Sequence, residues 1–282
     1  MCTTCGCSDG SRATMTDLQT GQRDLLGIER YYHDHHHDHD HHHDHGHGTV
    51  FLPHTHVGGR VVQIERDVLT KNNLIAERNR GWFAGRNILA LNLVSAPGAG
   101  KTTLLERTIR ELDGELTIGV IEGDQATLND AERISATGAR VVQINTGTGC
   151  HLEADMTARA LTNLDPPPGS VLMIENVGNL VCPALFDLGE RMKVVVASVT
   201  DGEDKPLKYP HMYRAAGLVL LNKIDLLPHL NFDLGQFTDY LHQVNPSVRL
   251  LQVSAASGQG LEGWYDWIRQ EAKGSRLLVT SS

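Results

Sequence analysis

The strongest constraint on the fold of this chain is an alternation of short apolar runs with helix-like stretches from residue 89 onward. The runs are rich in Val, Ile and Leu, and helical patterns separate most neighbouring runs. They lie at 89–95, 116–122, 140–146, 171–176, 193–199, 218–223 and 249–255. Continuous apolar strands joined by helices indicate a mostly parallel sheet covered on both faces. We therefore expect an α/β fold whose β-sheet is flanked by helices.

The composition changes near Gly59 and divides the chain into two parts. A helical pattern begins at Val61, so residues 60–282 are expected to form the globular domain. Residues 8–30 are polar and weakly patterned, which is typical of a linker. The His- and Asp-rich stretch that follows cannot build a hydrophobic core. We accordingly predict a disordered N-terminal tail over residues 1–59.

Length, charge and cysteine usage exclude several classes of protein. No window approaches about 18 consecutive apolar residues, so a membrane-spanning helix is not expected. The net charge of −9 argues against a nucleic-acid-binding surface. The start, MCTTCGCSDGSR, lacks the pattern of a secretory signal, and the cysteine count of five is odd. Reduced thiols and a cytoplasmic location are therefore expected.

A glycine-rich turn, SAPGAGKTT at 95–103, links the first apolar run to a helical stretch. Glycines let backbone N–H groups approach phosphates, and the helix N-terminus adds a partial positive charge. Lys101 is expected to reach the β- and γ-phosphates, and the Thr102 hydroxyl to ligate Mg²⁺. Ser95 replaces the usual first glycine, but the strand–turn–helix context still predicts a P-loop NTPase. The predicted phosphate-binding residues are Gly98, Ala99, Gly100, Lys101, Thr102 and Thr103.

A second nucleotide motif closes the sixth apolar run. It consists of Asn222 and Lys223 followed, after one residue, by Asp225. A carboxylate accepts hydrogen bonds from the N1–H and the exocyclic amine of guanine, and adenine lacks that donor pair on this edge. Ser254 and Ala255 follow the next run and fit a loop that supports the base. The predicted nucleotide is therefore GTP, with GDP as the product.

Acidic residues end two further strands, where an open α/β sheet presents its ligand crevice. We predict that Asp124 binds Mg²⁺ and acts on the attacking water, and that Glu175 takes the position of the usual Walker-B acid. With Lys101, these two acids are the predicted catalytic residues. The N–H of Gly178 is expected to sense the γ-phosphate. Each acid has an alternative reading as a simple turn-forming residue.

Two groups in the tail have the composition of metal ligands. Cys2, Cys5 and Cys7 can converge on one soft or borderline ion, with the α-amine as a fourth ligand. This set suits square-planar Ni²⁺, and Zn²⁺ would also bind. The other group suits several weakly held Ni²⁺, Cu²⁺ or Zn²⁺ ions, because neutral imidazoles bind all three. It contains His33, His35, His36, His37, His39, His41, His42, His43, His45 and His47.

A third group of metal-ligand residues lies inside the predicted domain. Cys150 and His151 are adjacent in a glycine-rich loop, and Cys182 follows Glu175 by seven residues. A metal held by these residues would respond to nucleotide state through the segment that contains Gly178. The alternative is that the cysteines are small buried hydrophobic residues. Three protein ligands leave a tetrahedral or square-planar ion incomplete, so a second chain, water or a partner must complete it.

These motifs together resemble the HypB family, GTPases that help insert nickel into [NiFe]-hydrogenase and belong to the SIMIBI class of P-loop proteins. The resemblance covers nearly the whole chain. It rests on CxxCGC, the His-rich insert, VSAPGAGKTTLL, IEGDQATLNDAERI, TGTGCHLEADM, IENVGNLVCPA, GEDKPLKYP and LLNKIDLLP. It implies that Cys2, Cys5 and Cys7 form a high-affinity nickel site. It also implies that Cys150, His151 and Cys182 form the metal site of the GTPase domain.

The function that this resemblance implies is that of a GTP-hydrolysing nickel metallochaperone. It also implies a homodimer across the nucleotide face, and it implies a HypA-type nickel chaperone and the hydrogenase large-subunit precursor as partners. The sequence offers no obvious catalytic arginine, so we expect slow hydrolysis. Two alternatives stay open at this point. One is a nickel storage or detoxification protein with secondary GTPase activity, and the other is a urease-type accessory GTPase.

Overall fold

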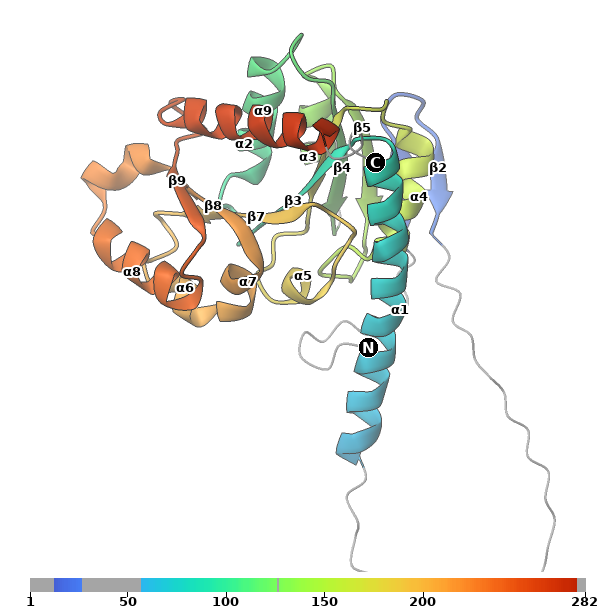
Figure 1. Cartoon of the computed structure of the whole chain (residues 1–282), viewed down its shortest axis with the longest axis horizontal. Helices are drawn as coiled ribbons and strands as arrows, with labels where there is room; N and C mark the ends of the chain where they lie inside the picture. Colours follow the sequence, from blue (N-terminus) through green and yellow to red (C-terminus); the bar gives the residue numbers. More distant parts are fainter. Residues whose placement is uncertain (1–12, 27–56, 126, 278–282) are drawn as a thin grey trace, which may run out of the picture.

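Nine strands form one sheet with helices on both faces in the computed structural model, which describes residues 13–26, 57–125 and 127–277 (Figure 1). Their order across the sheet is β2-β1-β5-β4-β6-β3-β7-β8-β9. All neighbouring strands from β5 to β9 pair in parallel. The parallel strands are β3 (Leu89–Ser95), β4 (Ile118–Asp124), β5 (Arg140–Asn145), β6 (Val171–Glu175), β7 (Met192–Ser198), β8 (Ala216–Asn222) and β9 (Arg249–Gln252). Each overlaps a predicted apolar run, so the predicted α/β fold is confirmed.

Helices cover the two faces of the sheet through separate apolar clusters (Figure 1). One face packs against α2 (Lys101–Glu111), α3 (Asn129–Ser135) and α9 (Leu261–Leu277). The other packs against α1 (Val57–Gly85), α4 (Ala154–Leu164), α7 (Pro210–Ala215) and α8 (Leu234–Val244). Because the central strands are buried from both sides, their sequences are continuously apolar. No helix among the described residues is long and apolar enough to cross a bilayer.

The shorter helices lie in connections that follow the carboxyl ends of parallel strands. They are α5 (Cys182–Leu185) after β6, α6 (Lys205–Lys208) after β7, and the 3₁₀ helix η1 (Ile224–His229) after β8. The phosphate loop and α2 follow the carboxyl end of β3. In an open α/β sheet this edge carries the ligand crevice. The predicted nucleotide and domain-metal motifs are therefore all connected to one edge of the sheet.

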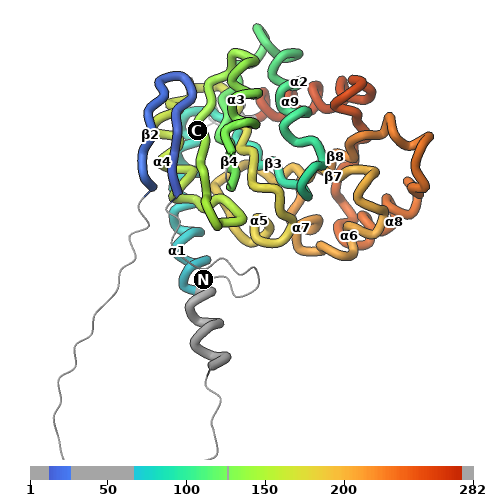
Figure 2. Tube along the Cα trace, turned by 180° about the vertical axis from the view of Figure 1, so that it is seen from behind, coloured from blue at the N-terminus to red at the C-terminus, as the bar shows by residue number. Residues whose placement is uncertain are grey.

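The segment predicted as a linker contains two strands. β1 (Thr14–Asp17) and β2 (Arg23–Leu25) form an antiparallel hairpin, and β1 pairs antiparallel with β5 at the sheet edge (Figure 2). Met15 is buried, and the Gln19 side chain holds the hairpin to the backbone of the segment that enters β5. The linker prediction for residues 8–30 is therefore wrong at these strands. Residues 1–12 and 27–56 of the predicted tail lie outside the described part of the chain.

Candidate nucleotide and metal sites

The phosphate loop is shaped by two left-handed glycines and one buried hydroxyl. Gly98 and Gly100 have φ angles of 74° and 95°, which non-glycine residues rarely adopt. Lys101 begins α2, and its Nζ donates to Ser95 Oγ over 2.8 Å. Ser95, at the position where a glycine is usual, thus supplies an acceptor that holds the lysine inside the loop. Thr103 lies in the first turn of the helix, where its Oγ1 accepts from Arg133 at 3.3 Å.

The second nucleotide motif connects the phosphate loop with the predicted base loop. Asn222 Nδ2 donates to the carbonyl of Ala99 over 2.9 Å, and Asn222 Oδ1 accepts from the N–H of Ala255 over 3.0 Å. Lys223 Nζ donates to the carbonyl of Gly98 over 2.7 Å. Ser254 precedes Ala255 and is fully buried. The structure therefore brings together residues predicted from three separate motifs.

Asp225, the predicted base-recognition residue, has one carboxylate oxygen that could accept hydrogen bonds from a ligand. Its Oδ1 is buried, yet it has no hydrogen-bond partner within the described part of the chain. Buried polar atoms in folded proteins nearly always have a partner, so an orphaned carboxylate oxygen points to a ligand. The paired N1–H and amine of guanine would supply the missing donors. This observation supports the predicted guanine specificity.

Oxygen ligands suited to Mg²⁺ meet between the phosphate loop and β6. Thr102 Oγ1 donates to Glu175 Oε1 over 2.8 Å. Glu175 is buried, and burial raises the pKa of its carboxyl, while the charge of Lys101 opposes that shift. Glu175 Oε2 is buried and unpartnered among the described residues. Hard oxygen donors are the ligands that Mg²⁺ prefers, so this pair fits the ion.

The other two predicted γ-phosphate residues lie at the same edge. Asp124 ends β4, beside β6, and its Oδ2 accepts from the backbone N–H and hydroxyl of Thr127 at 2.8 and 3.0 Å. A β-carbon added to Gly178 would lie 3.2 Å from the α-carbon of Pro97 in the phosphate loop. The segment after β6 therefore packs directly on the phosphate loop. The proposed roles of Asp124 and Gly178 stay predictions.

Glu122 is a buried acid to which sequence reasoning assigned no role. It lies on β4 in register with Glu175 on β6 and with Gln143 on β5. Burial, followed by the neighbouring Glu175 carboxylate, raises the pKa of Glu122 to about 9. The carboxyl is therefore neutral at pH 7. Its signal in the sequence is an acid within an otherwise apolar run.

Three potential soft-metal ligands converge beside this edge, although they come from different loops. Cys150 and His151 lie in the loop after β5, and Cys182 begins α5. The two sulfurs are 3.1 Å apart, too far for a disulfide bond, and Cys150 Sγ lies 3.7 Å from His151 Nδ1. All three ligand atoms fall within 4.8 Å of one another. Two thiols and an imidazole fit Ni²⁺ or Zn²⁺.

The surroundings favour the metal-binding form of His151. Burial lowers its pKa to about 4, so the imidazole is neutral at pH 7. Metal binding requires that neutral form. The ring of Phe186 lies 3.9 Å from the His151 ring, centroid to centroid. The cysteines and histidines predicted to bind metal in the tail lie outside the described residues.

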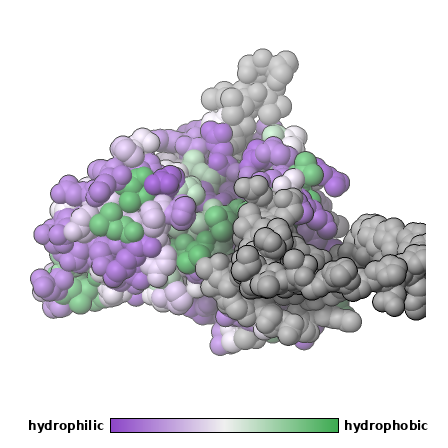
Figure 3. Space-filling model, turned by 90° about the horizontal axis from the view of Figure 1, so that it is seen from below, coloured by the Kyte–Doolittle hydropathy of each residue, from purple (hydrophilic) through white to green (hydrophobic). Residues whose placement is uncertain are grey.

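Apolar side chains are exposed close to Cys182. Val181, directly before it, is 45% exposed, and Leu185 on the same short helix is 51% exposed. Figure 3 shows hydrophobic patches among hydrophilic surface on the lower face of Figure 1, the side of α5 to α8. Exposed apolar surface of this kind is typical of an interaction site when it forms a contiguous patch.

Comparison with known proteins identifies the family. Residues 89–252 match the CobW/HypB/UreG nucleotide-binding domain. The hydrogenase maturation factor HypB of Escherichia coli K12 is 47% identical and aligns over 96% of this chain and 99% of that protein. The HypB of Rhizobium leguminosarum bv. viciae is 56% identical over 80% of this chain and 76% of that protein.

A solved structure extends the similarity to three dimensions. The crystal structure of HypB from Helicobacter pylori in complex with nickel is 34% identical and matches with a TM-score of 0.68. The match covers 72% of this chain and 96% of that chain. The fold, the nucleotide-binding domain and the near full-length similarity therefore agree, and the chain belongs to the HypB family of hydrogenase maturation factors, which are nickel-binding GTPases.

Proposed function

We propose that this chain hydrolyses GTP to control the delivery of nickel during [NiFe]-hydrogenase maturation. The observation that carries the nucleotide part is the position of Asn222. Its amide holds the phosphate loop and the base loop together, while the nearby Asp225 offers an orphaned carboxylate oxygen. This arrangement fits a guanine nucleotide whose base is bound at Asp225 and whose phosphates are bound at Lys101.

The chemistry follows from the groups around the phosphates. Water attacks the γ-phosphorus, the bond to the bridging oxygen of the β-phosphate breaks, and GDP and inorganic phosphate leave. Lys101 stabilises the charge that develops, and Asp124 orients the water and takes its proton. Thr102 and Asp124, together with Glu175, would hold Mg²⁺, which supplies further charge neutralisation when bound. Hydrolysis is slow in this proposal, because no arginine finger is assigned.

Nickel is the cargo at Cys150, His151 and Cys182. These donors leave the coordination incomplete, and we infer that a second copy of the chain completes it across the nucleotide face. The exposed Val181 and Leu185 beside Cys182 support such a contact. The proposed partners are a HypA-type nickel chaperone and the hydrogenase large-subunit precursor. The proposal also includes Zn²⁺ as an alternative metal at this site and a cytoplasmic location.

Nucleotide state and metal affinity are linked in this proposal. Cys182 follows Gly178 by four residues, and Gly178 packs on the phosphate loop. A change at Gly178 on hydrolysis would move Cys182 relative to Cys150 and His151. Linkage then requires that metal alter nucleotide affinity by the same factor, typically about 5- to 150-fold.

Base specificity provides the direct test of the nucleotide assignment. Phosphate release from GTP and from xanthosine triphosphate should be measured for the parent chain and for Asp225→Asn. The parent is expected to hydrolyse GTP, and the variant to prefer the xanthine nucleotide, because the amide can donate to the xanthine 2-oxo group. Activity on the xanthine nucleotide also serves as the folding control. Equal use of GTP by both proteins would overturn the assignment.

A further inference from the structure

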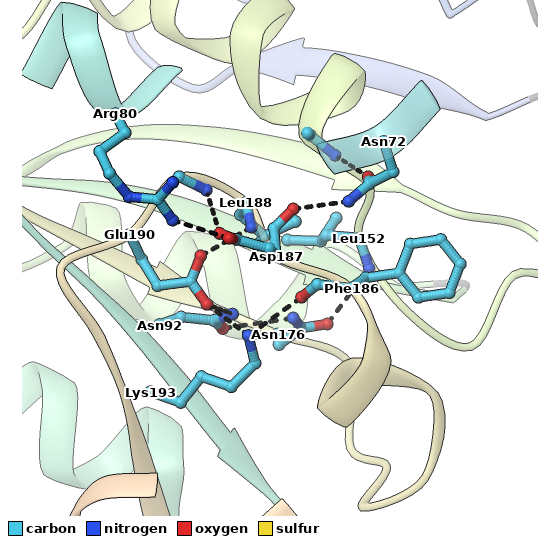
Figure 4. A network of polar contacts seen from close by, with 12 residues as sticks. Asn72, Arg80, Asn92, Leu152, Asn176, Phe186, Asp187, Leu188, Glu190 and Lys193 are labelled. Atoms are coloured by element: carbon cyan, nitrogen blue, oxygen red, sulfur yellow. Dashed lines mark hydrogen bonds and ion pairs between the residues drawn. The ribbon is translucent and has the colours of Figure 1, made fainter. Parts of the chain in front are cut away.

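We propose that Asn176 is the positioning residue through which the nucleotide site sets the geometry of His151. The inference deepens the proposed function and rests on it, because it concerns the route of coupling between nucleotide and nickel. Asn176 directly follows Glu175, the proposed Mg²⁺ ligand, and is 1% exposed. The feature that carries the inference is a closed path of contacts that begins and ends at this side chain. Figure 4 shows its hydrogen bonds.

The first part of the path joins the two sites through one amide. Asn176 Oδ1 accepts from the N–H of Val177 at 3.0 Å and from the N–H of Leu152 at 3.2 Å. Val177 precedes Gly178, which packs on the phosphate loop, and Leu152 directly follows His151. A shift of the Val177 backbone therefore changes a hydrogen bond to the residue beside the metal-binding imidazole.

The second part of the path returns to His151 from its other side. Asn176 Nδ2 donates to Asn92 Oδ1 over 3.2 Å, and Asn92 Nδ2 donates to Glu190 Oε1 over 3.1 Å. Lys193 Nζ donates to the same Glu190 oxygen over 2.6 Å and to the carbonyl of Phe186 over 3.0 Å. The Phe186 ring then packs on the His151 ring. Figure 4 shows that Asn92, Asn176, Glu190 and Lys193 converge beside the loop that contains Phe186.

Because the path is made of buried hydrogen bonds, we expect it to change by breaking or keeping whole bonds and not by small distortions. Asn92, Asn176, Glu190 and Lys193 are all buried, so any lost hydrogen bond leaves a polar group without water. The amide of Asn176 has a fixed orientation, because a flip would turn its NH₂ toward two N–H donors. Movement at Val177 must therefore be followed by Leu152, or the network must break.

A second asparagine braces the same loop from a different direction and provides a matched control. Asn72 on α1 is also buried. Its Oδ1 accepts from the N–H of Ala154 at 2.9 Å, and its Nδ2 donates to the carbonyl of Asp187 over 2.7 Å. Asn72 thus supports the His151 and Phe186 loops, but neither of these contacts reaches Val177 or Gly178, the residues that lead to the phosphate loop. If Asn176 were merely structural, removing either asparagine would have the same effect.

The test measures nickel affinity in two nucleotide states. The full chain should carry Cys2→Ala, Cys5→Ala and Cys7→Ala, so that the thiolate-to-Ni²⁺ charge-transfer absorption arises from the domain cysteines alone. Nickel binding by the His-rich stretch is silent in this band and equal in both states. The protein is titrated with Ni²⁺ in GDP and in a non-hydrolysable GTP analogue, and the ratio of the two affinities is the readout.

The parent background is expected to show a ratio in the range of about 5 to 150. Asn176→Ala should reduce the ratio to within about twofold of unity, whereas Asn72→Ala should weaken both affinities together and keep the ratio. A ratio of unity in the parent overturns the coupling proposed above and this inference with it. A ratio that survives Asn176→Ala overturns the role of Asn176 and leaves the proposed function intact.

A second variant addresses the return path should Asn176→Ala fail to fold. Phe186→Leu keeps the backbone carbonyl that Lys193 contacts and removes the aromatic face against His151. The expected result is again a reduced ratio between the two nucleotide states, with folding checked by circular dichroism. An unchanged ratio in this variant would show that His151 is set independently of the network and would also overturn the proposal.

Discussion

A β-carbon added to Gly100 would lie 2.6 Å from Nδ2 of Asn222, well inside van der Waals contact. Gly100 also has a φ angle of 95°, so two separate constraints require glycine at this position. The close approach exists because Asn222 reaches into the phosphate loop to donate to the carbonyl of Ala99. The shape of the phosphate loop and the position of the base loop are therefore not independent.

Gly100→Ala should weaken guanine nucleotide binding beyond its effect on folding. Displacing Asn222 removes the hydrogen bonds to Ala99 and Ala255, each worth about 1 kcal/mol. The expected loss of GDP affinity is therefore roughly 10- to 100-fold. Fluorescence titration with a labelled GDP measures it.

Gly114→Ala is the control for this substitution. Gly114 has a φ angle of 78°, and a β-carbon there would meet no atom within 4 Å. The substitution carries a backbone penalty of roughly 1–2 kcal/mol. Gly114 precedes β4, so it lies at the amino ends of the parallel strands, away from the nucleotide site. The Tm of the variant should therefore fall while its GDP affinity stays unchanged. Equal affinity losses in both variants would mean that the Asn222 contact is unimportant.

The parallel strands could be predicted, because each is an apolar run whose residue types indicate burial. The β1–β2 hairpin could not be predicted from the sequence. β1 and β2 have four and three residues, and their sequences TMTD and RDL show little periodicity. Their stability comes from the exposed edge of β5, which offers a row of backbone partners that local sequence does not reveal.

The candidate sites also contain some residues that could be predicted from the sequence and others that could not. The phosphate loop and the Asn222 motif are contiguous in sequence, so their chemistry is readable residue by residue. The hydrogen bond between Asn92 on β3 and Asn176, which follows β6, joins residues that are 84 positions apart. Asn176 lies within the IENVGNLVCPA motif, but that motif does not indicate which residue its side chain contacts. In the sequence, Ser95 is only a departure from the usual glycine. The structure shows its role, because the Ser95 hydroxyl accepts a hydrogen bond from Lys101.

Lys101→Ala should separate nucleotide chemistry from nickel binding in the tail. Lys101 is held in the phosphate loop by Ser95, whereas Cys2, Cys5 and Cys7 precede the domain in sequence. Loss of one charge-stabilising group is expected to lower kcat on the order of 10²- to 10³-fold. Nickel bound by the tail cysteines should be unchanged in equilibrium dialysis. Lys208→Ala, which removes an exposed partner of Asp204, should affect neither. If Lys101→Ala also lost the nickel bound by the tail cysteines, GTP hydrolysis and nickel binding in the tail would not be separable.

The ten histidines between His33 and His47 should bind several Ni²⁺ ions reversibly. Ni²⁺ binds neutral imidazole, whose ordinary pKa is about 6.5. Binding capacity should therefore fall as pH decreases from about 7.5 to about 5.5. Deleting residues 33–47 should lower the stoichiometry measured by atomic absorption, yet spare hydrogenase maturation when nickel is plentiful. A deletion with unchanged stoichiometry would remove the storage role.

Glu122→Gln should stabilise the nucleotide-free protein, and increasingly so at higher pH. The pKa of Glu122 is about 9 in the folded chain against 4.5 in the unfolded chain, because burial and Glu175 disfavour its ionised form. Between these values the folded state binds more protons, so stability is full below about pH 4.5 and is lost as pH rises toward 9. Glutamine cannot ionise, so the variant does not lose stability in this way. The expected gain in the free energy of unfolding at about pH 8 is on the order of 1–3 kcal/mol, or several degrees in Tm.

Glu115→Gln is the control for this substitution. Contact with Arg269 lowers the pKa of Glu115, which stays ionised in both states above about pH 6. Its Tm difference from the parent should therefore be constant from about pH 6 to 9. A Glu122→Gln difference that is equally flat would mean that the buried carboxyl is ionised.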